Sequence, residues 1–292
     1  MLILLTNDDG IYAPGLAALK QALDGLGEVC VVAPATEQSG VGHSITYLRP
    51  LIVKEVYQGD RPFGYAVEGS PADCVKLGVN ELCPRRPDLV VSGINGGLNA
   101  GINVLYSGTV AAAVEGAFFG ILSVAVSLEF DENPPFDRAA GHAVQIIQHI
   151  HSRWSDLGAR LFNVNIPLQA AFQDSPEVRV VAMDVGRYGG NYEKRTDPWG
   201  RTYYWATGDP PPRRDAPGTD LLTLAQGKIS VTPLHYDLTA RRALEQIDQS
   251  DFVLIPRPVP SPNGASAAVN QTLVLRSARR TSRGGSKRRD GS

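Results

Sequence analysis

The sequence predicts a three-layer α/β fold in which helices cover both faces of a doubly wound, mostly parallel, Rossmann-like sheet. Short apolar runs alternate with helical patterns over the first 130 of the 292 residues, which is typical of parallel β–α–β units. These runs are almost continuous in Val, Ile and Leu, so the strands are expected to be buried on both faces. Hydrophobic residues make up 43% and charged residues 20% of the chain, a normal balance for a globular protein.

The elements of the first half follow from apolar spacing and from Pro and Gly. Residues 2–6 read as the first strand. Pro14 suits the first turn of a helix, which Gly27 ends. The leucines of this helix recur at spacings of three and four: Leu16, Leu19, Leu23 and Leu26. The other elements expected here are strands at 29–33, 51–57, 64–68, 89–92 and 121–127 and helices at 71–82 and 109–119.

After residue 130, strand and helix patterns alternate less regularly. A helix is expected at 136–154, with an inward face of Ala143, Ile147, Ile150 and Trp154. The remaining elements expected are strands at 161–166, 178–183, 229–232 and 252–255 and a helix at 239–247. Residues 186–220 are rich in Gly, Pro, Tyr and Trp, which indicates a long loop or a projecting arm. We expect one domain over residues 1–270, with 186–270 supplying an arm and oligomer contacts.

Charge is distributed unevenly along the chain. The formal net charge is −2, but residues 276–292 hold seven basic residues and one acidic residue. The first 275 residues therefore hold 21 basic and 29 acidic residues, a balance of −8. An acidic body argues against a nucleic-acid groove, which needs a basic stripe. Residues 271–292 are expected to form a disordered basic tail.

The cysteines and the apolar runs indicate a cytoplasmic protein. Cys30, Cys74 and Cys83 are odd in number and have no CxxC spacing, which fits free thiols in a reducing compartment. The N-terminal apolar run of five residues has no basic residue before it and is too short for a signal peptide. No apolar stretch approaches the roughly 20 residues that a membrane span needs. We therefore expect no membrane association.

Oxygen-bearing side chains follow three of the predicted strands. Asp8 and Asp9 come directly after the first strand, Ser39 lies in the loop after the second, and Asn95 follows the strand at 89–92. In a parallel sheet, ligands bind beyond the carboxyl ends of the strands, so these side chains are expected at one rim. Two carboxylates with neutral oxygens suit one divalent cation such as Mg²⁺ or Mn²⁺. The alternative is that Asp8 and Asp9 merely form a turn before the next helix.

A glycine-rich loop and a helix start favour phosphate binding at the same rim. Glycines in residues 93–101 allow close backbone approach to an anion. The helix that follows opens with Ser107, Gly108 and Thr109, whose amides and dipole attract a phosphate. The alternative is an ordinary Ser or Thr N-cap. Gly40 and Gly96 complete the phosphate set expected from the loops.

Several familiar site types are missing from the sequence. It has no GxxxxGK(S/T), no GxGxxG after the first strand, no GxSxG and no HExxH, which excludes the sites that these motifs build. His43, in the Ser39 loop, is a candidate proton donor to a phosphate or leaving group, and His235 is a weaker one. His142, His149 and His151 are expected on a solvated helix face.

Seven sequence blocks, in order and with the expected spacing, resemble the SurE survival-protein family. They are LLTNDDG (4–10), APATEQSGVGHSIT (33–46), GSPADCV (69–75), VSGINGGLNAG (91–101), YSGTVAAAVEG (106–116), NVNIP (163–167) and ISVTPLHYDLT (229–239). The resemblance covers roughly residues 1–255. Ser70, Ala112 and residues 183–187 depart from the family's usual sequence, and the last of these affects any inference about substrate preference.

The resemblance implies a metal-dependent nucleotidase. Members hydrolyse nucleoside 5'- and 3'-monophosphates and sometimes polyphosphate. Their metal ligands correspond to Asp8, Asp9, Ser39 and Asn95. Their phosphate and neighbouring positions correspond to Asn99, Ser107 and Thr109. Members form homodimers or homotetramers that exchange C-terminal elements, so residues 186–270 are expected to form a projecting or swapped region.

Three interpretations remain open for the acidic pair, two of them enzymatic and one non-enzymatic. In the favoured one, Asp8 and Asp9 hold the cation and one of them, preferentially Asp9, accepts a proton from water. In the second, Asp8 is a covalent nucleophile, although aspartyl-phosphate enzymes use a DxD spacing rather than adjacent acids. The third is a receiver-like signalling module, which is about half this length and needs a late-strand Lys that is not evident here.

Overall fold

The computed structural model describes residues 1–153, 158–186, 191–207 and 216–247. The chain divides into two compact units, Met1–Leu238 and Thr239–Ser292. In the second unit the described structure is helix α7 (Arg241–Gln246), which buries no residue and corresponds to the helix expected at 239–247. The strand expected at 252–255 and the tail at 271–292 lie outside the described residues. The single domain over 1–270 therefore stays a prediction.

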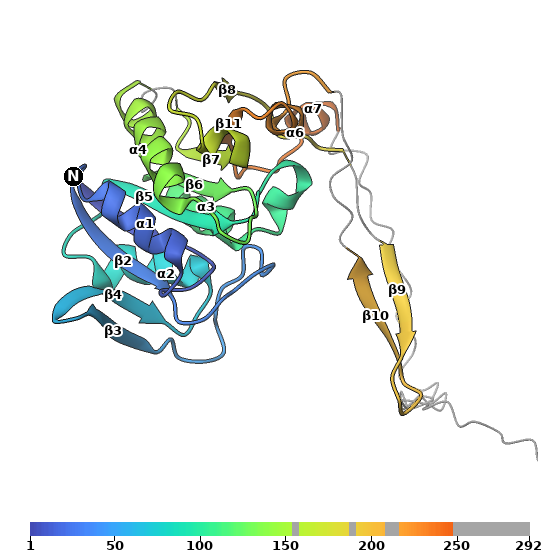
Figure 1. The fold of residues 1–292 in the computed structure, drawn as a ribbon, viewed down its shortest axis with the longest axis horizontal. Helices are drawn as coiled ribbons and strands as arrows, with labels where there is room; N and C mark the ends of the chain where they lie inside the picture. The colour runs from blue at the N-terminus through green and yellow to red at the C-terminus, as the bar shows by residue number, and fades with distance from the viewer. Residues whose placement is uncertain (154–157, 187–190, 208–215, 248–292) are drawn as a thin grey trace, which may run out of the picture. The chain divides into compact units, whose positions relative to one another are not determined.

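The first unit contains a nine-stranded sheet in the order β3-β4-β2-β1-β5-β6-β7-β11-β8 (Figure 1). The strands from β4 to β7 in this order are all parallel, β3 and β11 are each antiparallel to their neighbours β4 and β7, and β8 is parallel to β11. This confirms the predicted, mostly parallel sheet. The strands are β1 (Leu2–Thr6), β2 (Glu28–Pro34), β3 (Val53–Gln58), β4 (Arg61–Val67), β5 (Leu89–Gly96), β6 (Leu122–Leu128), β7 (Leu161–Ile166), β8 (Val178–Val180) and β11 (Ile229–Leu234).

Helices pack on both faces of the sheet, as the buried strands require. On one face α1 (Pro14–Leu23) and α4 (Phe136–Arg153) contribute to the largest apolar cluster. On the other face α2 (Pro71–Leu77), the π-helical turn η1 (Gly78–Leu82) and α3 (Gly108–Phe118) pack over two further clusters. The other helices of this unit are the 3₁₀ turn η2 (Gly101–Leu105), α5 (Leu168–Ala171) and α6 (Asp220–Ala225).

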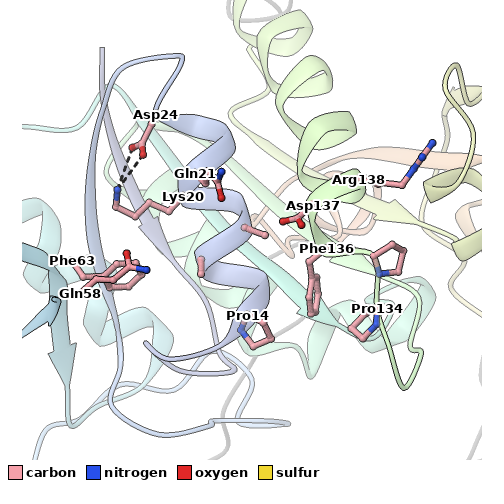
Figure 2. Close-up of a pocket in the computed structure, with 13 residues that line it drawn as sticks. Pro14, Lys20, Gln21, Asp24, Gln58, Phe63, Pro134, Phe136, Asp137 and Arg138 are labelled. Carbon is pink, nitrogen blue, oxygen red and sulfur yellow. Dashed lines mark hydrogen bonds and ion pairs between the residues drawn. The ribbon is translucent and has the colours of Figure 1, made fainter. Parts of the chain in front are cut away.

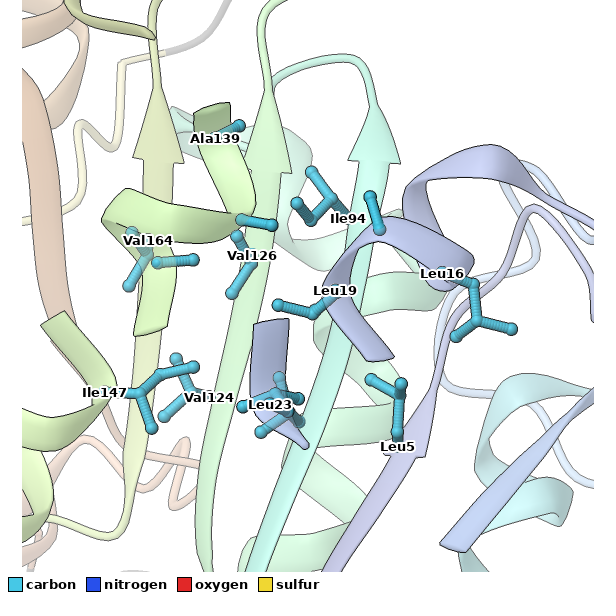
Figure 3. Close-up of a cluster of buried hydrophobic side chains, with 14 of the residues drawn as sticks. Leu5, Leu16, Leu19, Leu23, Ile94, Val124, Val126, Ala139, Ile147 and Val164 are labelled. Atoms are coloured by element: carbon cyan, nitrogen blue, oxygen red, sulfur yellow. The ribbon is translucent and has the colours of Figure 1, made fainter. Parts of the chain in front are cut away.

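The apolar residues from which the strands and helices were predicted form the core of the structure. All five residues of β1 are buried, and Leu5 faces Leu19 and Leu23 of α1 in the cluster drawn in Figure 3. Ile147 of α4 packs over Val124 in the same cluster. The predicted inward residues Ala143, Ile147 and Ile150 are fully buried, while Trp154 lies outside the described residues.

One helix–sheet contact and one strand–strand contact depend on glycine. Gly116 of α3 lies so close to the sheet that a Cβ there would be 2.5 Å from Ser123 Oγ and 2.8 Å from Val90 Cγ2. Gly93 of β5 has φ +141°, and a Cβ there would be 2.3 Å from Val126 O. These contacts hold α3 and the end of β5 close to β6, so they fix the rim at which both elements meet.

Several predicted boundaries differ from the structure. The first helix ends at Leu23, so Leu26 packs on the core from the turn that follows. The helix predicted at 71–82 is α2 continued by η1. β5 continues to Gly96, beyond the predicted end at residue 92. The strand predicted at 178–183 is shorter in the structure, where β8 has only three residues.

The region predicted as a loop or arm contains a β-hairpin. β9 (Asn191–Thr196) and β10 (Thr202–Thr207) pair antiparallel in a separate two-stranded sheet, and every residue of both strands is exposed. Aromatic residues favour strands, but all of these are exposed, so the sequence has no alternation of buried and exposed positions that would have predicted the two strands. A role for this region in oligomer contacts stays a prediction. Within the described residues, no helix has the length and apolar character needed to span a bilayer.

Candidate active site

The turn after β1 presents two carboxylates at the carboxyl edge of the sheet. The neighbours of β1 are β2 and β5, so the strand order reverses here and ligands are expected at this rim. Asn7 is fully buried and closes the turn: its Nδ2 donates to Gly10 O at 2.9 Å, and Gly10 N donates to Asn7 Oδ1 at 3.2 Å. This local bonding holds Asp8 and Asp9 at the rim.

Asp8 is a buried carboxylate supported by the start of α3. It is 5% exposed, and Thr109 Oγ1 donates to its Oδ1 at 2.5 Å. A Cβ on Gly108 would lie 2.9 Å from Asp8 Cβ and 3.0 Å from Oδ2, so the helix start can approach this carboxylate only with glycine there. Burial raises the pKa of Asp8, although the Thr109 hydrogen bond acts to lower it. The ionised carboxylate is therefore poorly stabilised by the protein alone.

Asp9 stands beside Asp8 and reaches β5. Its Oδ2 accepts a hydrogen bond of 3.4 Å from Gly96 N. Burial, and then the negative charge of Asp8, raise the pKa of Asp9 to about 6. The charge of Glu37 acts in the same direction on both acids, so three carboxylates crowd this rim. Such an arrangement is stabilised by a cation.

Glu37 was missed in the sequence interpretation. Its Oε1 accepts a hydrogen bond of 2.5 Å from Ser39 Oγ, so it orients the predicted hydroxyl ligand. The available signal was its position two residues before Ser39 in the same loop. Gln38 N also donates to Asp8 O at 2.8 Å, which attaches this loop directly to the acidic turn.

A cleft of about 200 Å³ brings most of the predicted residues together. Its lining comprises Asp8, Ser39, Gly40, Asn95, Leu98, Asn99, Asn103, Tyr106 and Ser107. Three of the four predicted metal ligands and three of the six predicted phosphate residues are in this set. The remaining predicted residues adjoin it: Asp9 bonds to Gly96, and Gly108 and Thr109 contact Asp8.

Asn99 is held in place by residues at the end of β7. Its backbone N donates to Asn165 Oδ1 at 2.8 Å, and its carbonyl accepts from Asn163 Nδ2 at 2.7 Å and from Asn165 Nδ2 at 3.1 Å. Its own Nδ2 donates to Ser127 Oγ at 2.9 Å. These bonds, which the sequence interpretation did not foresee, give a structural reason for the NVNIP block.

The sequence left two alternatives open for the start of α3, an ordinary Ser or Thr N-cap and a phosphate-binding helix start, and the structure has features of both. Ser107 is the N-cap, and its Oγ accepts from Val110 N at 3.1 Å. The same residue lines the cleft beside Asp8. The first turn of this 11-residue helix therefore meets the acidic rim, with a dipole that favours negative charge.

His43 is engaged away from the cleft. Its Nε2 lies 2.8 Å from Oε2 of the buried Glu115 on α3, whose Oε1 lies 3.3 Å from Lys76 Nζ. Burial acts to raise the pKa of Glu115, but the His43 hydrogen bond and the Lys76 charge outweigh it and lower the pKa. This cluster ties the Ser39 loop to α3. His43 does not line the cleft, which disfavours the proton-donor role considered for it.

Replacing Glu115 by Gln is expected to lower the free energy of unfolding at pH 7 by about 1–2 kcal/mol, because a buried charged acceptor is lost while its partners are partly solvated. The folded-state pKa lies below the ordinary value of 4.5, so this contribution is present above pH 4.5 and disappears as the pH falls through the folded pKa. Urea unfolding at pH 7 and pH 3.5 measures it. Glu81→Gln, at an exposed glutamate, is the matched control. Equal stability of Glu115→Gln and the native chain at pH 7 would contradict the role.

The other histidines also lie outside the cleft. His235 stacks on Tyr236 at 5.1 Å, and its Nδ1 accepts from Asp237 N at 2.9 Å. His149 and His151 are exposed as predicted, whereas His142 is half-buried. His142 and His149 line a separate cavity of about 460 Å³ between α4 and the edge of the sheet.

A larger cavity of about 640 Å³ lies beside α1 and contains none of the predicted residues. Figure 2 shows it between Pro14 of α1, Phe63 of β4 and Phe136 at the start of α4. Its basic side chains are already paired: Lys20 with Asp24, and Arg138 with Asp174, at 3.3 Å and 3.0 Å. The smaller cleft is the better candidate because the carboxylates of Asp8 and Asp9 at its rim repel each other and Asp8 faces the start of α3.

The donor set at the cleft fits a hard divalent cation. Among the described residues, no group of three or more His, Cys, Asp or Glu could hold a metal ion. The predicted set is of a different type, with two carboxylates, one hydroxyl and one amide oxygen, and water or substrate would complete the coordination. Burial and the neighbouring negative charges raise the pKa values of Asp8 and Asp9, and a bound cation would offset both effects.

Comparisons of the sequence and of the structure with known proteins find the same family. The sequence profile of the family described as "Survival protein SurE" matches residues 3–194. A protein of Rhodopirellula baltica named 5'-nucleotidase SurE is 57% identical over 248 residues, 85% of this chain and 97% of that one. One of the same name from Syntrophobacter fumaroxidans is 46% identical over 82% of this chain and 95% of its own. The crystal structure of a SurE protein from Aquifex aeolicus has a TM-score of 0.75 and 38% identity, covering 86% of this chain and 100% of that one.

Proposed function

The chain belongs to the survival protein SurE family, and on that premise we propose that it is a metal-dependent phosphomonoesterase that hydrolyses nucleoside 5'-monophosphates to nucleoside and phosphate. The names of the curated relatives support the nucleotidase activity. The proposal extends to nucleoside 3'-monophosphates and short polyphosphate as further substrates, to a homodimer or homotetramer, and to a cytoplasmic location.

The observation that carries the proposal is the meeting of three strand ends and one helix start at a single cleft. Asp8, Ser39 and Asn95 line it together with Ser107, and Asp9 adjoins it. Asp8, Asp9, Ser39 and Asn95 would hold one Mg²⁺ or Mn²⁺. When bound, such a cation polarises a phosphoryl oxygen and makes a bound water more acidic.

The protein residues supply orientation, charge stabilisation and a proton acceptor. The amides at the start of α3 and the helix dipole stabilise negative charge on the phosphoryl group, which is the main requirement of phosphoryl transfer. Asp9 Oδ2 is bonded to Gly96 N, so Asp9 Oδ1 is the oxygen assigned to accept the proton of the attacking water.

Initial rates over a panel of nucleoside 5'- and 3'-monophosphates test the proposal. The protein is first treated with EDTA and then assayed alone, with Mg²⁺ and with Mn²⁺. We expect phosphate release from the 5'-monophosphates only after a cation is restored. Turnover that survives chelation, or no turnover of any nucleotide, would contradict it. Trapping of a base-labile phosphoenzyme would instead favour Asp8 as a covalent nucleophile.

A further inference from the structure

An exposed aromatic side chain stands at the rim of the cleft. Tyr106 lies between η2 and α3, is 62% exposed, and lines the same cleft as Asp8 and Ser39. In the part of the chain that the structure describes, its ring has neither an aromatic neighbour nor a hydrogen bond. A large, unpartnered aromatic surface beside a polar cleft is a surface on which a planar ligand group can stack.

Hydrogen bonds hold the backbone from which this ring projects. Tyr106 O accepts from Gly42 N at 3.0 Å, and Tyr106 N donates to Asn103 O at 3.0 Å. The next residue, Ser107, is the N-cap of α3 and donates its own N to Asn103 O at 3.1 Å. The ring is therefore attached to the helix start that would face the phosphate, and little backbone order has to be gained when a ligand binds.

The size of the cleft indicates where the base of a nucleotide must lie. The cleft has about 200 Å³, whereas sites that enclose whole small ligands have about 300–1,000 Å³. With the phosphate at Asp8 and Ser107, the enclosed space holds the phosphate and part of the sugar. The base then lies outside, against the rim. Leu98 and Tyr106 are the apolar or aromatic residues in the lining, and Tyr106 is the exposed one.

Other exposed aromatic residues do not offer this arrangement. Phe118 and Tyr236 pack edge-to-face at 4.7 Å, and Phe118 also lies 5.2 Å from the ring of His43. Neither lines the cleft, and both already have ring partners. Tyr106 alone combines exposure, a place in the cleft and a free ring face among the described residues.

We propose that Tyr106 is the residue on which the nucleobase of the substrate stacks, which makes it a specificity-determining residue. The inference rests on the proposed function. Stacking on a tyrosine ring tolerates every base, because each base has a π-face, and it distinguishes nucleotides from sugar phosphates that lack a base. Asn103, which also lines the cleft, provides a side-chain amide with both donors and an acceptor.

The test compares AMP with ribose 5-phosphate, which has the same phosphoester but no base. Tyr106→Ala is expected to raise the KM for AMP about 5- to 150-fold, the usual range for loss of one base–aromatic stack. The kcat for AMP and both constants for ribose 5-phosphate should remain those of the native enzyme. Adenosine, as an inhibitor of ribose 5-phosphate hydrolysis, should lose affinity by the same factor. Tyr106→Phe should retain the native values, because the ring remains.

Leu105→Ala is the matched control, because Leu105 is the neighbouring exposed residue and does not line the cleft. An unchanged KM for AMP in Tyr106→Ala would overturn the inference while leaving the nucleotidase intact. Equal losses with AMP and ribose 5-phosphate, or equal losses in Tyr106→Ala and Tyr106→Phe, would also overturn it. Failure of the native enzyme to hydrolyse either substrate would overturn the proposed function, and the inference with it.

Discussion

Asp8→Asn is expected to abolish hydrolysis of p-nitrophenyl phosphate and of AMP while leaving the fold intact. Loss of residues that merely orient a metal ligand costs about 10- to 100-fold, so loss of a ligand itself should exceed that range. The substitution keeps the shape of the side chain and removes a buried charge whose pKa is already raised. The melting temperature of the metal-free variant should therefore be no lower than that of the native protein.

Two comparisons make this expectation specific. Mn²⁺ should raise the melting temperature of the native protein, because a ligand that binds only the folded state stabilises it, and it should not do so for Asp8→Asn. Asp137→Asn changes an exposed acid at the start of α4, outside the cleft, and should retain native turnover and the native response to Mn²⁺. Near-normal turnover in Asp8→Asn would remove Asp8 from the mechanism.

Thr109→Val is expected to lower kcat/KM by about 10- to 100-fold and to weaken metal binding by a similar factor, as is usual when a group that orients a metal ligand is lost. Thr109 is fully buried, and its hydroxyl donates to Asp8 Oδ1 at 2.5 Å. Valine has nearly the same shape but cannot donate, so the carboxylate loses its orientation and its main stabilising hydrogen bond. Calorimetric titration with Mn²⁺ and steady-state kinetics measure the two effects.

Thr109→Ser is the control for this prediction, because it retains the hydroxyl and removes only a methyl group. It should remain within a few-fold of the native enzyme in both measurements. Equal losses in the Ser and Val variants would indicate that packing, rather than the hydrogen bond to Asp8, explains the effect.

The sequence predicted those parts of the fold that depend on local pattern. The apolar run of β1 and the leucine spacing of α1 each correspond to a buried face in the structure. The rim could also be predicted, because the carboxyl ends of parallel strands share one edge and Asp8, Ser39 and Asn95 each follow a strand. Once the parallel sheet is predicted correctly, these three side chains are expected to lie together, and in the structure they line one cleft.

Contacts between residues far apart in the chain could not be read from the sequence. Asn165 supports Asn99 from 66 residues away, and Glu115 meets His43 from 72 residues away. Nothing in the sequence near these residues distinguishes them from other polar residues, because their partners come close only in the folded chain. The hairpin β9–β10 was missed for a different reason: all its residues are exposed, so no alternation of buried and exposed side chains marks its strands.

The central claim is that side chains from separate segments of the chain bind one divalent cation. Crystals soaked in Mn²⁺ and measured at the manganese absorption edge test it most directly. The account predicts one anomalous peak in the cleft, within bonding distance of Asp8, Asp9, Ser39 and Asn95. A map with no peak there, or with the manganese bound only to other residues, would contradict it.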